Sequence, residues 1–203
     1  MLDKRLPYFN MLMRADWQAV RQIAPGPLPA GYRYRTYVPG DMEHWARIET
    51  SVGEFDDEAD ARACFASHYL PHADMLPGRL WFVLDADGVP QATANAWYDA
   101  WDGRRWASLH WVAVCPGHQG RGLGYAVTGA ALAAFPEREP MRDVYLHTQT
   151  WSYRAVGIYL RHGFSLLREE TFAHHRNDYD EAVRALPGYM RSELYDLMIR
   201  TAR

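Results

Sequence analysis

The spacing of hydrophobic residues changes along the chain and predicts an alternation of strands and helices. Residues 32–38 alternate and are rich in aromatics, which is typical of a strand, whereas Met42, Trp45 and Ile48 recur at helical spacing. Asp41 precedes that helix and is suited to cap it. The same reasoning predicts further elements: a helix over 59–70, strands over 80–84, 89–98 and 106–114, a helix over 122–135, a strand over 144–148, a helix over 153–162 and a strand over 164–168.

The two ends of the chain are patterned differently from its middle. Residues 7–13 predict a short edge strand, which a Pro- and Gly-rich stretch over 25–31 separates from the main body. Residues 178–203 predict a helical segment. The element order predicts an α/β fold with a mixed sheet flanked by helices. The length of 203 residues favours a single domain over 1–203. Within it we expect an N-terminal extension (1–30), a core (31–170) and a C-terminal helical appendage (171–203).

Composition narrows the class of protein. Hydrophobic residues make up 48% of the chain, so it can bury a sizeable core. The net charge of −3 argues against a nucleic-acid partner, which would favour a basic face. Two cysteines, Cys64 and Cys115, do not make a disulfide framework and fit a cytoplasmic protein. No apolar run is long enough to span a membrane or act as a signal peptide.

A glycine-rich loop between an expected strand and an expected helix is the strongest chemical signal. Its sequence is Gln119-Gly120-Arg121-Gly122-Leu123-Gly124. Glycines let the backbone approach a ligand closely, and a helix N-terminus presents unpaired N–H groups to an anion. The spacing fails the dinucleotide fingerprint G-x-G-x-x-G, because Tyr125 and Val127 stand at its last position. It also lacks the Gly-Lys-Ser/Thr ending of a phosphate-binding P-loop.

The loop and its flanks resemble the GCN-five-related acetyltransferase (GNAT) superfamily. The loop matches the pattern Q-x-x-G-x-G, and residues 109–114 resemble the strand that precedes it. Residues 152–164, with Ala155, Tyr159 and Gly163-Phe164, resemble a second family signature, in which Ser152 replaces the usual Asn. The resemblance covers roughly residues 32–168 and implies a GNAT-like, centrally splayed sheet.

The resemblance implies acetyl-CoA as co-substrate and names the residues that would bind it. Backbone groups of the strand end would hold the pantetheine arm, loop amides would hold the pyrophosphate, and Arg121 would add charge. The full set of expected binding residues is Val112, Ala113, Val114, Gln119, Gly120, Arg121, Gly122, Leu123, Gly124, Tyr125, Ser152 and Tyr159.

The expected reaction is direct attack of a primary amine on the thioester in a ternary complex. Tyr159 is the candidate general acid, because a phenol keeps its proton at neutral pH. The amine must lose a proton, and His110 is the first candidate base because histidine titrates near neutrality. Glu49 and Glu54, at and after the first expected helix, are alternative bases. Cys115 is expected to pack and not to act as a nucleophile.

The acceptor is less defined than the donor. Acidic residues at 54 and 56–58 would attract a cationic amine, or simply begin a helix. Aromatic residues would line a pocket for an arylalkylamine or aliphatic amine, or belong to the core: Trp97, Tyr98, Trp101, Trp106 and Trp111. No motif for a metal is present, and a homodimer remains open. A longer acyl-CoA donor and a non-catalytic acyl-CoA sensor are the alternative functions.

Overall fold

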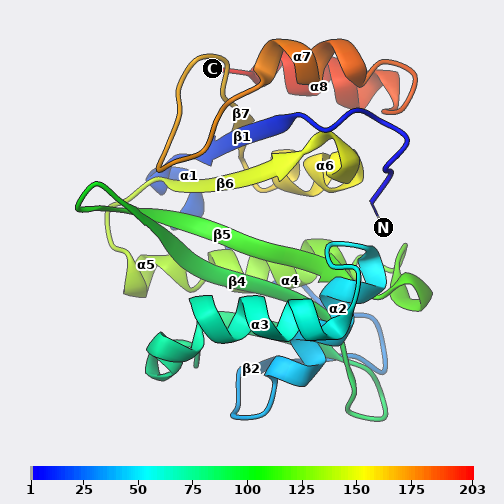
Figure 1. The fold of residues 1–203 in the computed structure, drawn as a ribbon, viewed down its shortest axis with the longest axis vertical. Coiled ribbons are helices and arrows are strands. Elements are labelled where there is room, and N and C mark those ends of the chain that lie inside the picture. Colours follow the sequence, from blue (N-terminus) through cyan, green and yellow to red (C-terminus); the bar gives the residue numbers. More distant parts are fainter. Residues whose placement is uncertain (1) are drawn as a thin grey trace. The chain divides into compact units, whose positions relative to one another are not determined.

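The computed structural model describes residues 2–203 and contains one mixed sheet with flanking helices (Figure 1). The seven strands are ordered β2-β3-β4-β5-β6-β1-β7. The strands are β1 (Asn10–Ala15), β2 (Arg33–Thr36), β3 (Leu80–Leu84), β4 (Pro90–Trp101), β5 (Arg104–Val114), β6 (Val144–Gln149) and β7 (Ser165–Leu166). The α-helices are α1 (Trp17–Val20), α2 (Met42–Val52), α3 (Glu58–His68), α4 (Leu123–Leu132), α5 (Phe135–Arg138), α6 (Tyr153–Arg161), α7 (Tyr179–Ala185) and α8 (Ser192–Thr201). The 3-10 helices are η1 (Leu70–Met75), η2 (Pro116–His118) and η3 (Thr150–Ser152).

Contacts divide the chain into two compact units, and β4 and β5 contribute residues to both. The first unit contains residues 24–96 and 110–134, and the second contains residues 2–23, 97–109 and 135–203. The prediction of a mixed α/β sheet is confirmed, since β2, β3 and β4 pair antiparallel while β5 and β6 run parallel.

In the first unit, polar side chains define how α2 and α3 begin. Asp41 occupies the N-cap position of α2, but its side chain does not cap the helix. Instead it accepts hydrogen bonds from the Val38 N–H at 2.7 Å and from the Arg35 guanidinium at 2.6 Å. Asp57 caps α3, because its carboxylate accepts the Asp60 N–H at 2.9 Å. The two helices begin close to where the sequence predicts, but the prediction that the Asp41 side chain caps the first of them is wrong, and no cap was predicted for α3.

One face of the sheet in this unit packs against α2 and α3. Phe82 pairs with Thr93 and lies under the Arg35 guanidinium, which also contacts the start of α2. Leu80 pairs with Asn95, so both share this face. Tyr37 stacks on Phe65 of α3 with ring centroids 6.3 Å apart. Thr93 and Asn95 of β4 therefore lie on the face that packs against the two helices.

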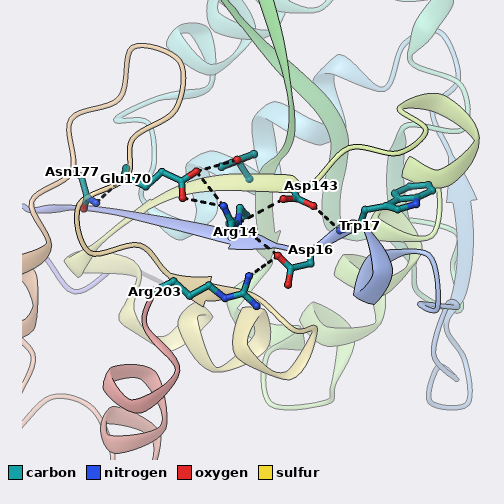
Figure 2. Close-up of polar contacts among 8 residues, drawn as sticks. Arg14, Asp16, Trp17, Asp143, Glu170, Asn177 and Arg203 are labelled. Atoms are coloured by element: carbon teal, nitrogen blue, oxygen red, sulfur yellow. Dashed lines mark hydrogen bonds and ion pairs between the residues drawn. The ribbon is translucent and has the colours of Figure 1, made fainter.

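In the second unit, β1 lies between β6 and β7 and pairs antiparallel with both. The prediction of an edge strand for residues 7–13 is therefore wrong. Arg14 of β1 joins several segments (Figure 2), because its guanidinium lies 3.0 Å from Glu170 and 3.8 Å from Asp143. Asp143 also accepts the Trp17 N–H at 2.8 Å, at the start of α1. These contacts tie β1 to the loops that flank β6 and β7.

The C-terminal segment contains two helices where the sequence analysis predicted one continuous helical region. α7 ends before Pro187-Gly188, and Gly188 has φ of 86°. The proline cannot continue the helix, and the left-handed glycine reverses the chain direction. Figure 1 shows α7 and α8 in orange to red beside each other, with α7 in contact with β1 and α8 with β7.

Candidate active site

The end of β5 is irregular immediately before the glycine loop. Trp111 has φ of 50°, a left-handed conformation that bulky residues rarely adopt. Its ring stacks on Phe55 at 5.4 Å and contacts Trp45 at 5.3 Å, which holds the residue in place. Beyond it, Ala113 is buried, while Val112 and Val114 are half-buried. At an irregular strand end, some backbone N–H and C=O groups are not bonded to the neighbouring strand and can bond to a ligand.

The glycine loop turns sharply before α4. Gly120 and Gly122 have φ of 75° and 82°, and Gly122 is the N-cap residue of α4. A Cβ built at either position meets no atom within 4 Å, so the loop surface is open there. Two side-chain hydrogen bonds fix the loop. The Gln119 Nε2 donates to the Val114 carbonyl at 2.8 Å, and the Tyr32 hydroxyl lies 2.8 Å from His118 Nδ1.

The amides of the loop are available for an anion. Within residues 2–203, the N–H groups of Gly120 to Gly124 make no hydrogen bond of standard geometry, and the Ala126 N–H is the first to bond into α4, to Gly122 O at 3.0 Å. Arg121 is exposed, Leu123 and Gly124 are buried, and Tyr125 is 38% exposed. Unpaired amides at the N-terminus of a ten-residue helix have the geometry and partial positive charge that suit a phosphate group.

The three candidate bases lie in the first unit in different environments. His110 is half-buried on β5, and its Nδ1 lies 3.0 Å from the Tyr69 hydroxyl. Glu49 faces inward from α2 and is 1% exposed. Burial raises the pKa of Glu49 well above its ordinary value, and the charge of Glu54 raises it further. Glu54 is half-buried in the loop after α2. His110 thus combines a polar partner with partial access.

Tyr159 and Ser152 belong to the second unit. Tyr159 lies on α6, is 7% exposed, and meets Phe164 edge-on with ring centroids 6.1 Å apart. Ser152 is the N-cap residue of α6, but its hydroxyl makes no capping hydrogen bond. The helix predicted over 153–162 is confirmed at 153–161.

Two of the acidic residues after α2, Asp57 and Glu58, make contacts that stabilise α3. Asp57 caps α3, and Glu58 lies 3.3 Å from Arg62 one turn later. Cys115 is 6% exposed, and its Sγ accepts hydrogen bonds from Arg47 at 3.4 Å and from Ser51 at 3.7 Å. These contacts tie Cys115 to α2.

The aromatic residues singled out by the sequence lie in separate environments. Trp111 packs in the first unit, as described above. In the second unit, Trp106 packs edge-on against Tyr145 at 5.2 Å, and Trp101 is 55% exposed. His175 stacks on His147 at 4.7 Å.

Among residues 2–203, no group of three potential ligands is placed to hold a metal ion. No described helix is long and apolar enough to cross a membrane.

Two residues near the candidate base were missed by the sequence analysis. Tyr69 follows α3 and is buried, yet its hydroxyl reaches His110. Trp45 appeared only as part of a helical pattern, but it contacts both Phe65 and Trp111. Neither position belongs to a motif. A tyrosine just before the helix-ending Pro71 carries no signal of a distant histidine.

Comparison with known proteins identifies the class. The sequence profile of the "Acetyltransferase (GNAT) family" matches residues 41–164, which is more than half of the chain. The chain therefore belongs to the acetyltransferase (GNAT) family.

Two curated relatives within this family are similar in sequence to the chain. The chain is 29% identical over 168 residues to a mycothiol acetyltransferase of Beutenbergia cavernae, covering 75% of this chain and 56% of that protein. It is 32% identical over 158 residues to a mycothiol acetyltransferase of Actinosynnema mirum, covering 75% and 52%. The chain thus spans about half the length of the curated relatives it matches.

Solved structures share the fold at low sequence identity. A GCN5-related N-acetyltransferase from Sphaerobacter thermophilus superposes with a TM-score of 0.59 at 19% identity, covering 80% of this chain and 49% of that one. A second from Ralstonia eutropha gives a TM-score of 0.52 at 22% identity, covering 72% and 97%. These similarities support the GNAT fold predicted from the glycine loop and its flanks.

Proposed function

We propose that the protein transfers an acetyl group from acetyl-CoA to a primary amine of a small molecule, by direct attack in a ternary complex. The observation that carries this proposal is the run of unpaired amides from Gly120 to Gly124 at the start of α4, on a chain of the acetyltransferase family. A loop that is open at Gly120 and Gly122, where no Cβ is present, and that has free N–H groups fits a pyrophosphate.

The residues proposed to bind acetyl-CoA come from the strand, the loop and the helix start. Backbone groups of Val112 to Val114 would hold the pantetheine arm beside the irregular strand end. The amides of Gly120 to Gly124 would bind the pyrophosphate, with Gln119 bracing the loop, Arg121 adding charge and Tyr125 beside them in the first helical turn. Ser152 is proposed as a further contact from α6. Bound acetyl-CoA supplies the acetyl group as an activated thioester.

Two side chains are proposed to move protons. His110 accepts a proton from the ammonium group, because only the neutral amine has a free electron pair for attack. The Tyr159 hydroxyl donates a proton to the departing sulfur, since a phenol holds its proton at neutral pH. Glu49 is a weaker candidate base because it is buried, and Glu54 is weaker because it lies on a loop after α2.

The acceptor is proposed to be a small-molecule amine. Two relatives carry the name mycothiol acetyltransferase, which supports a small acceptor and not a protein substrate. Trp111, which follows His110 on β5, and Phe55, which stacks on Trp111, are half-buried and would suit the carbon skeleton of an amine. The acidic loop after α2 would attract the charge of the amine.

The proposal is tested by titrating the full chain with acetyl-CoA and then measuring thiol release across a panel of aliphatic, arylalkyl and amino-sugar amines. Binding followed by amine-dependent release is expected. Binding without release for any amine would favour an acyl-CoA sensor, and faster release from a longer acyl-CoA would change the donor. Absence of binding would refute the proposal.

The role of Tyr159 is tested separately. Tyr159→Phe is expected to lower turnover by on the order of a hundredfold with little change in acetyl-CoA affinity, because only proton donation is lost. Tyr153→Phe, a buried tyrosine of the same helix, is the matched control. Full turnover by Y159F would remove Tyr159 from the mechanism.

A further inference from the structure

The β4–β5 hairpin determines which residues lie opposite His110. Asp102 and Gly103 both have positive φ, 49° and 71°, which is the two-residue turn that suits a hairpin. Counting back from this turn places Asn95 opposite His110. The same count places Gln91 opposite Val114. The N–H that donates to Gln91 O, at 2.8 Å, is instead that of Cys115, so β5 contains one additional residue before this point. The additional residue is Trp111, whose left-handed φ is typical of a bulge.

The register puts His110 on the face that packs against α2 and α3. Directly opposite residues of antiparallel strands share a face, and Asn95 also pairs with Leu80 on that face. Asn95 and Thr93 are fully buried, and among residues 2–203 neither side chain has a hydrogen-bond partner. The face of the sheet that carries His110 therefore also carries two buried polar side chains, Asn95 and Thr93.

Tyr69 reaches His110 from the end of α3 and is held rigidly. It is 1% exposed, its ring packs against Phe65 at 5.2 Å and Trp45 at 6.3 Å, and its N–H bonds to Phe65 O at 2.9 Å. A buried tyrosine packed on two aromatic rings has little rotamer freedom. The 3.0 Å contact between its hydroxyl and His110 Nδ1 is thus a fixed feature of the fold.

We propose that Tyr69 is a positioning residue that sets the tautomer of His110. A phenol can donate or accept, and in this proposal it accepts: the Nδ1–H of the imidazole donates to the Tyr69 oxygen, which leaves the electron pair on Nε2. Nε2 then accepts the proton of the acceptor's ammonium group, and the phenol oxygen continues to accept from Nδ1–H once the ring is charged. The hydrogen bond made by one ring nitrogen decides which form the other takes. The inference rests on the proposed role of His110 as base.

The tautomer is measured directly by long-range ¹H–¹⁵N correlation spectra of the full chain labelled with ¹⁵N-histidine, recorded at pH 8 without ligand. The His110 signals are assigned by their loss in His110→Gln. In the wild type they are expected to show the Nδ1–H form. In Tyr69→Phe they are expected to shift toward the Nε2–H form, with kcat lowered about tenfold for the fastest amine of the panel and the KM for acetyl-CoA unchanged.

Two further variants make the test specific. Tyr37→Phe removes another phenol that packs on Phe65 and is expected to leave both spectrum and rate unchanged. Adding Y69F to H110Q is expected to cause no further loss of rate, because Tyr69 acts through His110. A further tenfold loss, or an Nε2–H form in the wild type, would overturn the inference.

The failure of the base and the failure of its positioning have different signatures. If H110Q keeps full activity, the proposed base is wrong, and with it the role of Tyr69. If H110Q is slow but Y69F changes neither the tautomer nor kcat, the base stands and only the inference about Tyr69 is overturned.

Discussion

Glu49→Gln is expected to make the protein more stable than the wild type, by an amount that increases with pH. The side chain is 1% exposed on α2, and among residues 2–203 its Oε1 has no hydrogen-bond partner. Burial raises the pKa of Glu49 well above its ordinary value of 4.5, with a further contribution from Glu54. The folded protein therefore holds a neutral carboxyl group over a pH range in which the unfolded chain ionises it.

The sign and size of the effect follow from linkage. With the folded pKa of Glu49 raised, its contribution to stability is fully present below pH 4.5 and is lost as pH rises to the folded value. Within that window the loss is about 1.4 kcal/mol per pH unit. For a chain of 203 residues this corresponds to roughly 3–5 °C in Tm per pH unit. Glutamine has the same shape and does not titrate, so the variant escapes this loss.

The assay is thermal unfolding of both proteins, followed by circular dichroism from pH 4.5 to pH 8. The Tm of E49Q relative to the wild type is expected to increase with pH across the window. In Glu54→Gln the window should be shorter, because the charge that helps to raise the pKa of Glu49 is gone. A Tm difference that does not vary with pH would refute the reasoning and would mean that Glu49 is charged in the folded state.

Two further predictions concern the binding loop and a helix start. Gly122→Ala places a Cβ at φ of 82°, and because the left-handed conformation costs roughly 1–2 kcal/mol, acetyl-CoA affinity should fall about tenfold by calorimetry. Gly117→Ala, in open space without that φ, is the control, and equal affinities would contradict the argument. Asp57→Ala should lower the free energy of unfolding in urea by about 1 kcal/mol through loss of the α3 cap. An equal loss in Asp56→Ala would point to charge and not capping.

Local patterns in the sequence were sufficient for most of the elements. The strand predicted over 80–84 has the same bounds in the structure, and the helices predicted after Asp41 and after Gly122 are both present. These elements follow from periodicity and from residues that end or begin helices. The break at Pro187-Gly188 was also visible in the sequence, and predicting a continuous C-terminal helical segment ignored it.

Long-range contacts were beyond the reach of the sequence. The edge position predicted for residues 7–13 was wrong because the partners of β1 are decided by distant strands. The contact between Tyr69 and His110 joins residues 41 positions apart, and no motif connects them. The left-handed Trp111 also runs against its sequence, since an aromatic residue in an alternating segment favours regular strand geometry.

The place of β1 in the sheet has a consequence for how the protein folds during synthesis. Met13 pairs with Leu146 on one side and Leu166 on the other, so β1 cannot complete its pairing until β6 and β7 have been synthesised. Pairings of such large sequence separation are slow to form. The apolar side chains of residues 11–13 are fully buried in the folded protein, so truncated chains ending before β7 would lack part of their cover and should be prone to aggregate.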